Sequence, residues 1–176
     1  MKEYTLHSGG AIGADITFEK IGREYGMVNF NHYWYGKMNP HSKPEDEISV
    51  EDFEEGKEMV FKANSILKRK GFEKYMNLLA RNWCQVKYSD ATYAISSIKN
   101  NKVSGGTGWM VAMSILHDKE LYVFDQDKNK WFYWNDGKFE TCITPKLTKN
   151  FAGVGTRQIN ENGIAAIRKL FERTIM

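Results

Sequence analysis

The sequence lacks the features of a disulfide-rich, secreted or membrane-spanning protein. Its 176 residues include only two cysteines, Cys84 and Cys142, which give no disulfide framework and are expected to be free thiols. It contains no apolar run of about 18 residues, the length that a membrane-spanning helix needs. Residues 1–5 lack the hydrophobic region of a signal peptide. We therefore expect a cytoplasmic protein with no membrane partner.

Charge of one sign and metal-ligand patterns are also scarce. The formal net charge is only +3, which is too small a balance to favour a nucleic-acid coat or a membrane surface. The four histidines stand at no metal-ligand spacing with cysteine or carboxylate support. We therefore expect no metal site and no cofactor, and nucleic acid is not a favoured partner.

The chain does have enough apolar material for one domain that spans residues 1–176. It is 41% hydrophobic and 14% aromatic, which suits a sizeable core. Short apolar runs typical of strands alternate with helical periodicity. This alternation predicts an α/β fold, a Rossmann-like domain with a mostly parallel sheet and helices on both faces.

One glycine-rich loop has the pattern of a phosphate cradle. It follows the apolar run 91–98 and precedes a helix predicted to end near residue 118. Its residues are Ser104, Gly105, Gly106, Thr107 and Gly108. Glycines let the backbone approach a ligand closely, and the helix points its unpaired N–H groups and positive dipole end at the loop. Such a turn can also be only a tight connection, so this loop does not decide the function alone.

A second loop of this kind joins a predicted strand, residues 3–7, to a helix that Gly26 ends. Its candidate ligand-binding residues are Ser8, Gly9, Gly10, Gly13 and Asp15. Asp15 can cap the helix, or it can accept hydrogen bonds from a ribose, because a carboxylate repels phosphate but suits a sugar diol. Three aromatic residues, 33–35, end the next predicted strand and can stack on a base, pack a core edge or contact another subunit.

A third loop follows a predicted strand near the end of the chain. Phe151, Ala152 and Val154 favour a strand buried on both faces, near the middle of the sheet. The loop residues are Gly153, Gly155, Thr156 and Arg157, and Asn160 or Asn162 is expected to cap the final helix. Arg157 is expected to contact a phosphate, or else to fix the loop by a salt bridge.

The segments between these loops predict two helices and a hairpin. Ser49 begins the first helix with a capping box and Gly71 ends it, while the second helix spans about residues 73–87. The second helix carries Arg81 and Asn82. Arg81 can reach a ligand at the glycine-rich loop of residues 104–108, or it can lie on the surface. Residues 125–142 predict an antiparallel aromatic hairpin, whose exposed aromatic residues suit an oligomer contact.

Right-handed crossovers place all strand-to-helix loops of a parallel sheet at one edge, so the three loops are expected to share one ligand. Backbone N–H groups and the arginines Arg81 and Arg157 suit phosphate, while the carboxylate of Asp15 suits ribose. These features predict a nucleotide or a phosphorylated sugar as the small-molecule partner.

Several runs of the sequence resemble one known superfamily. They are residues 4–15, 79–82, 89–95 and 105–108, and together they look like the SLOG superfamily, which contains the LOG phosphoribohydrolases, the DNA-processing protein DprA and the YpsA family. Residues 151–157 resemble the first strand and loop of those proteins but stand last, so residues 150–176 would be a permuted first βα unit. The order is similar to the circularly permuted YpsA-like branch. The resemblance implies a nucleotide-derived ligand at these loops and a homo-oligomer.

The resemblance also bears on catalysis. LOG enzymes use a glutamate in a Gly-Gly-x-Gly-Thr-x-Glu pattern, with an arginine on the preceding helix. The arginine falls here on Arg81, but the glutamate position falls on Val111 with Ala112 beside it, and neither side chain transfers a proton. We therefore expect a protein that binds a nucleotide-derived signal, ADP-ribose-like or cyclic, as a sensor or a sequestering sponge in phage–host defence. The alternative is a phosphoribohydrolase or nucleoside-phosphate N-glycosidase with Asp15, Glu19 and Arg81 as catalytic residues.

Overall fold

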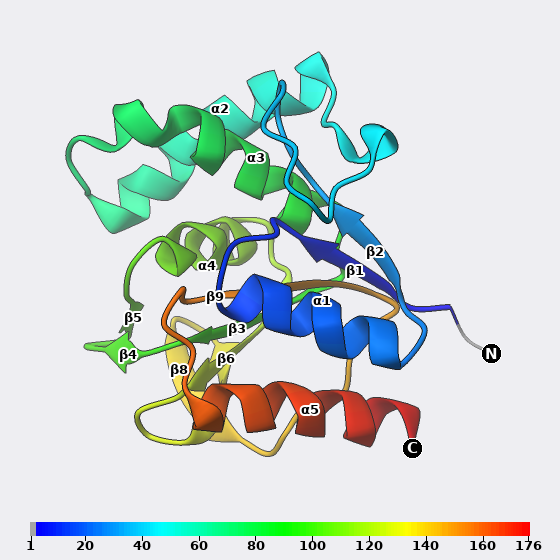
Figure 1. Ribbon diagram of the computed structural model, residues 1–176. Helices are drawn as coiled ribbons and strands as arrows, with labels where there is room; N and C mark the ends of the chain where they lie inside the picture. The colour runs from blue at the N-terminus through cyan, green and yellow to red at the C-terminus, as the bar shows by residue number, and fades with distance from the viewer. Residues whose placement is uncertain (1–2) are drawn as a thin grey trace.

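A seven-stranded sheet runs through the centre of the computed structural model, which describes residues 3–176 (Figure 1). Its strands are β1 (Thr5–Ser8), β2 (Val28–Asn31), β3 (Ala91–Ser96), β6 (Glu120–Asp125), β7 (Lys130–Asn135), β8 (Lys138–Cys142) and β9 (Asn150–Gly155). The strand order is β2-β1-β9-β3-β6-β7-β8. The first five strands in this order are parallel, and β7 and β8 extend the sheet through antiparallel pairing. The fold is therefore Rossmann-like α/β, as the sequence predicts.

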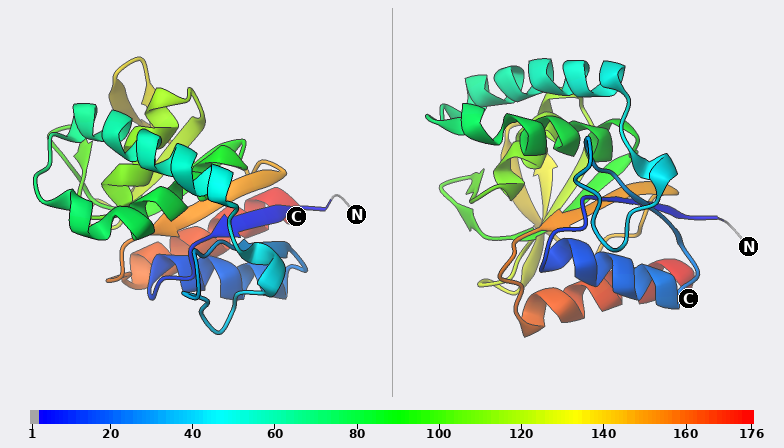
Figure 2. Two further views of the ribbon diagram at one scale, coloured as in Figure 1. Left: turned by 90° about the horizontal axis from the view of Figure 1, so that it is seen from above. Right: turned by 45° about the horizontal axis from the view of Figure 1, so that its top comes forward.

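Helices cover both faces of the sheet (Figures 1 and 2). One face carries α1 (Ala14–Glu24) and α5 (Glu161–Ile175), and the other carries α3 (Met76–Lys87) and α4 (Thr107–Leu116). The long helix α2 (Val50–Leu67) packs on the outside of α3 and α4. Two 3₁₀ turns, η1 (Pro44–Asp46) and η2 (Phe72–Tyr75), precede α2 and α3, and a two-stranded sheet, β4 (Ile98–Lys99) with β5 (Lys102–Val103), precedes α4.

The last strand, β9, lies near the middle of the sheet, between β1 and β3. Phe151, Ala152 and Val154 are completely buried, as expected for a strand with helices on both sides. Gly153 is needed because a Cβ atom at this position would come within 2.6 Å of the Phe18 ring on α1. The apolar run with an internal glycine therefore identifies a central strand even though it is the last in sequence.

The start of α2 is where the sequence predicts it, but the predicted end of this helix is wrong. Ser49 begins α2, and its side chain accepts a hydrogen bond from the Asp52 N–H at 3.1 Å. Gly71 does not end this helix, because Lys68 takes the left-handed conformation three residues earlier. The Asn64 side chain supports that turn through two hydrogen bonds with the Arg69 backbone, at 2.8 and 3.0 Å.

The antiparallel hairpin of β7 and β8 extends the sheet at one edge, as predicted. Asp136 and Gly137 have φ values of 47° and 85°, so the two-residue loop has the positive φ values of a type I′ turn. The expectation that its aromatic residues are exposed is wrong, because Phe132, Trp134 and Phe139 are half-buried against the core on the α4 side of the sheet. The homo-oligomer stays a prediction without this support.

Asn160, and not Asn162, caps α5, since its side-chain oxygen accepts a hydrogen bond from the Gly163 N–H at 3.0 Å. Over residues 3–176, none of the helices is long and apolar enough to cross a membrane.

Candidate functional site

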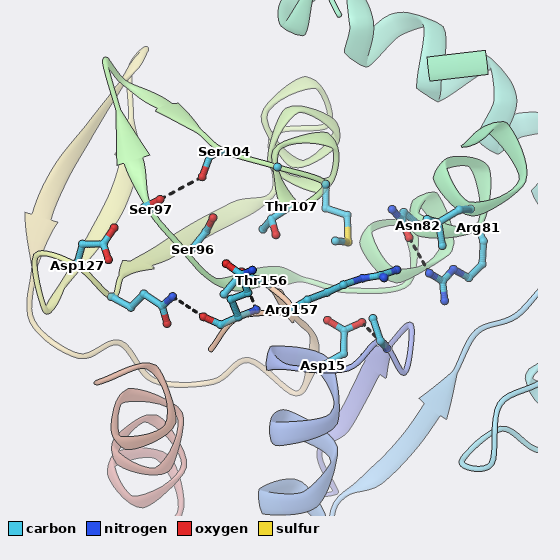
Figure 3. Close-up of a pocket in the computed structure, with 18 residues that line it drawn as sticks. Asp15, Arg81, Asn82, Ser96, Ser97, Ser104, Thr107, Asp127, Thr156 and Arg157 are labelled. Atoms are coloured by element: carbon cyan, nitrogen blue, oxygen red, sulfur yellow. Dashed lines mark hydrogen bonds between the residues drawn. The ribbon is translucent and has the colours of Figure 1, made fainter. Parts of the chain in front are cut away.

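The three glycine loops meet at the carboxyl edge of the parallel strands and surround a cleft of about 430 Å³ (Figure 3). The loop after β1 leads to α1 on one face of the sheet, and the loop after β3 leads to α4 on the other face. The strand β9 lies between them and ends in the third loop. The cleft therefore lies where the strand connections diverge, which is the usual ligand position in open α/β sheets.

Backbone hydrogen bonds and the Gln126 side chain hold the third loop against its neighbours. The Ala14 N–H donates to the Thr156 carbonyl oxygen at 3.0 Å, and the Thr156 N–H donates to the Ile95 carbonyl oxygen at 2.8 Å. Gln126, after β6, donates to the Gln158 carbonyl oxygen at 2.9 Å and accepts from the Asn160 N–H at 3.0 Å. The loops are thus joined to one another before any ligand binds.

The glycine loop before α4 is open on the side of the cleft. Gly105 has a φ of 66°, and a Cβ atom at Gly105 or Gly106 would meet nothing within 4 Å. Outside the cleft, Arg69 Nη1 donates a hydrogen bond of 2.7 Å to the Gly105 carbonyl oxygen. Ser97 and Ser104 hold the two sides of the β4–β5 turn together through a 3.1 Å hydrogen bond between their hydroxyl groups. The loop is therefore anchored, with free space above its glycines.

Arg81 is held in place by backbone carbonyl groups. Its Nη1 atom lies 2.6 Å from the Gly9 oxygen and 3.3 Å from the His32 oxygen, and Nη2 lies 3.2 Å from Asn82 Oδ1. Its Nε–H is buried without a hydrogen-bond partner among the described residues. Burial lowers the pKa of this guanidinium, while nearby Asp15 opposes the shift. Arg81 thus faces the cleft as a fixed cation and is not a surface arginine.

Arg157 is the second cation of the cleft and is held differently. Its side chain extends across the cleft toward Arg81 and Asn82 (Figure 3). It is exposed and forms no hydrogen bond or ion pair with any other residue in the range 3–176. The predicted salt bridge that would only fix the loop is therefore not observed within this range. An unpaired cation beside a fixed one suits an anionic group that binds between them.

Asp15 places a buried carboxyl group in the same cleft. It is 4% exposed, and its Oδ2 atom accepts a hydrogen bond from the Ala11 N–H at 3.3 Å. It does not cap α1, because Gly13 holds that position without a side-chain hydrogen bond. Burial raises the pKa of Asp15 to about 6, and the charge of Arg81 limits the rise. A carboxyl group in this range can change charge near neutral pH.

Ten of the predicted ligand-binding residues line the cleft. They are Asp15, Arg81, Asn82, Ser104, Gly105, Gly106, Thr107, Gly155, Thr156 and Arg157. The remaining six, Ser8, Gly9, Gly10, Gly13, Gly108 and Gly153, lie outside its lining. Those that line it supply two cations, one carboxyl group, hydroxyl groups and glycine backbone, which is the chemistry expected for a phosphorylated ligand.

The glycines outside the lining have a packing reason instead. A Cβ atom at Gly13 would collide with the Thr156 carbonyl oxygen, and one at Gly108 would come within 2.6 Å of the Val103 oxygen. Ser8 is buried and donates a 2.7 Å hydrogen bond to Glu19. These residues bring the loops close together and do not line the cleft, so a ligand contact for them stays a prediction.

Glu19, the second candidate carboxylate, lies outside the cleft lining. It is completely buried and accepts hydrogen bonds from Ser8 at 2.7 Å and from Asn31 at 2.8 Å. Burial raises the pKa of Glu19, while the Ser8 hydrogen bond opposes the shift. Val111 and Ala112 are buried in the core, so they add no reactive group either. Of the carboxylates proposed for catalysis, only Asp15 lines the cleft.

Sequence reasoning missed several polar residues that line the cleft. They are Ser96, Ser97, Gln126, Asp127 and Gln158. Three apolar residues that line the cleft, Ala11, Leu78 and Met110, were also missed. A usable signal was present for two pairs, because Ser96 and Ser97 lie at the carboxyl end of β3 and residues 126–127 directly follow β6. The predicted strand 91–98 was two residues too long and therefore hid the first pair.

Neither metal-site geometry nor similarity to known proteins adds to this description. Within the described part of the chain, no group of three or more His, Cys, Asp or Glu side chains is placed to hold a metal ion. Comparison of the chain with protein-family models, with curated proteins and with solved structures gave no match. The chemistry of the cleft itself is therefore the basis for any functional assignment.

Proposed function

We propose that the protein binds a nucleotide or nucleotide-derived molecule in the cleft and leaves it intact, as a sensor or a sequestering sponge for a signal of the ADP-ribose-like or cyclic type. The observation that carries the proposal is the meeting of Arg81 and Arg157 over an open glycine loop at the carboxyl edge of the sheet. Two guanidinium groups and the start of α4 suit phosphate oxygens. The resemblance to the SLOG superfamily, in its permuted YpsA-like branch, supports the same class of ligand.

Two features favour binding over turnover. The residues at the position of a LOG-type catalytic glutamate, Val111 and Ala112, are buried in the apolar core. The hydroxyl and amide groups of the cleft can position a sugar and phosphate, but they are weak acids and bases at neutral pH. A role in phage–host defence, in which a small protein removes a signalling nucleotide from solution, is consistent with a binder that does not consume its ligand.

Hydrolysis of an N-glycosidic bond is the second candidate, and one observation favours it. Asp15 lies in the cleft with its pKa raised to about 6 by burial, near the charge of Arg81. A carboxyl group in this pKa range can exchange a proton at neutral pH. In this alternative Asp15 acts as the acid or base, while Arg81 holds the phosphate.

Calorimetry with analysis of the ligand by mass spectrometry distinguishes the two candidates. The panel contains nucleoside monophosphates, ADP-ribose and cyclic nucleotides, each titrated into the protein and then recovered. The binding proposal predicts saturable binding with the ligand recovered unchanged. Release of free base or ribose phosphate at enzyme-like rates, abolished by Asp15→Asn, would instead establish the hydrolase. The absence of binding across the panel would contradict both.

A further inference from the structure

A second cavity adjoins the cleft and has the aromatic character that the cleft lacks. Among the described residues that line the cleft, none is aromatic. The second cavity, here called the side pocket, measures about 490 Å³ and is lined by Tyr33, Trp34, Lys37, residues 73–78 and Arg81. Leu78 and Arg81 line both cavities, so the two meet at these side chains.

From this arrangement we infer that the side pocket holds the base of a nucleoside phosphate whose sugar and phosphate lie in the cleft. The inference rests on the proposed function and narrows it, because a phosphorylated sugar without a base would leave the side pocket empty. The chemistry divides in the same way: hydroxyl groups and cations line the cleft, and aromatic rings line the side pocket. Bases stack on aromatic rings, whereas phosphates bind guanidinium groups.

Trp34 is a fixed stacking surface for a base. One face of its ring stacks on Phe53, with ring centroids 4.0 Å apart and an angle of 3° between the planes. Trp34 is only partly buried and lines the side pocket, with the Tyr35 ring tilted beside it at a centroid distance of 6.2 Å, so part of the ring surface that Phe53 does not cover faces this pocket. Phe53 is 7% exposed and belongs to the core, which holds the tryptophan ring in place. A ring held in this way loses little side-chain entropy when a base stacks on it.

A stripe of side chains leads from the side pocket to the cleft. Tyr75, Leu78 and Arg81 are spaced three residues apart through η2 and α3, a spacing that brings side chains to one side of a helix. Tyr75 and Leu78 are 54% and 43% exposed, so both rest against solvent-filled space. Asn77, also in the side pocket, has an amide that can donate to and accept from a base edge. The stripe gives one ligand a continuous path from base to phosphate.

The test compares ligands with and without a base on the intact protein. Ribose 5-phosphate and the four nucleoside 5′-monophosphates AMP, GMP, CMP and UMP are titrated by calorimetry into the wild-type protein, Trp34→Ala and Tyr75→Ala. Phe61→Ala is the matched control, because Phe61 is 58% exposed on α2 and lines neither cavity, although its ring packs edge-on against Phe72 with centroids 5.6 Å apart. We expect the best monophosphate to bind at least about tenfold more tightly than ribose 5-phosphate.

The variants show which residues supply the higher affinity for the monophosphate. Trp34→Ala and Tyr75→Ala are expected to remove most of it while leaving the affinity for ribose 5-phosphate unchanged, and Phe61→Ala to leave both affinities unchanged. If Trp34→Ala unfolds because it loses its contact with Phe53, the exposed Tyr75 still provides the test.

Three results would overturn the inference, and they differ in what they leave in place. Equal affinity of the wild-type protein for ribose 5-phosphate and for the best monophosphate overturns the base site but leaves phosphate binding in place. The same conclusion follows if Tyr75→Ala binds every monophosphate within about twofold of the wild-type affinity. If the wild-type protein binds neither class of probe while its fold is intact, the inference fails; the proposed function fails with it only if ADP-ribose and the cyclic nucleotides do not bind either.

Discussion

The guanidinium group of Arg81 holds the glycine loop after β1, since its Nη1 atom donates a 2.6 Å hydrogen bond to the carbonyl oxygen of Gly9. A residue that sequence reasoning assigned to the ligand therefore also organises the protein. Gly9 has no side chain for the same reason, because a Cβ atom there would come within 2.7 Å of the Arg81 guanidinium. The arginine thus links α3 to the loop after β1 and faces the cleft between them.

Arg81→Ala is expected to reduce both stability and binding. Loss of charged hydrogen bonds to the Gly9 and His32 oxygens should lower the free energy of unfolding by about 1.5–3 kcal/mol. Urea unfolding measures this change, with Arg173→Ala as a control for charge, because Arg173 is exposed near the end of α5. A fully stable Arg81→Ala protein would show that the arginine does not organise the loop.

Asp15→Asn is expected to stabilise the protein at neutral pH. Burial raises the folded-state pKa of Asp15 to about 6, above its ordinary value of 3.8, so ionisation is costlier in the folded state. The wild-type protein should lose stability as pH rises from about 4 to about 6, and the variant should not lose this part. The variant should therefore be more stable at pH 7 by about 1–3 kcal/mol and equal at pH 3.5. Equal stability at both pH values would mean that Asp15 titrates normally.

The same titration should control binding. Ionised Asp15 adds a negative charge to the cleft, so affinity for an anionic ligand should fall as pH rises through about 6. ADP-ribose is a suitable probe because its pyrophosphate diester keeps a constant charge over this range, unlike a monoester. The Asp15→Asn variant should bind ADP-ribose with little dependence on pH between 5 and 7.5. Parallel pH profiles for wild-type and variant would exclude Asp15 as the cause.

Gly106 provides a test of the phosphate cradle that is separate from charge. Its φ of −62° and ψ of −31° suit alanine, and a Cβ atom would meet nothing within 4 Å. Gly106→Ala should therefore leave stability unchanged or raise it by up to about 1 kcal/mol. If a phosphate lies against this loop, the added methyl group should weaken binding by about tenfold.

Gly153→Ala is the contrasting glycine variant. The new methyl group would press on the Phe18 ring in the core, so stability should fall by about 1–3 kcal/mol or more. For the Gly106→Ala variant, the measurement is calorimetric titration with the ligand. An affinity equal to that of the wild-type protein would show that the open glycine loop does not contact the ligand.

The sequence was informative where local chemistry determines the structure. The apolar run 150–155 predicted a central strand, and Asp136-Gly137 predicted the hairpin turn, because burial on both faces and positive φ leave clear residue patterns. The convergence of the three loops followed from the handedness of crossovers.

The sequence was less informative where packing determines which atoms face the cleft. Gly13 and Gly108 have the same pattern as Gly105 and Gly106, yet they are glycines because neighbouring backbone lies against them. The backbone partners of Arg81, Gly9 and His32, are likewise far away in the sequence. Trp34 lines the side pocket and not the cleft, because its ring stacks on Phe53 of α2, which is distant in the sequence.

Arg157 provides the most direct test of the central claim that the cleft binds a nucleotide phosphate. It is exposed and unpaired within residues 3–176, so Arg157→Ala should leave the unfolding temperature unchanged. The decisive measurement is calorimetric titration of wild-type and Arg157→Ala proteins with the tightest ligand of the nucleotide panel. We predict that the variant loses about 1.5–3 kcal/mol of binding free energy. Equal affinity in the two proteins, or no binding to the wild type, would contradict the account.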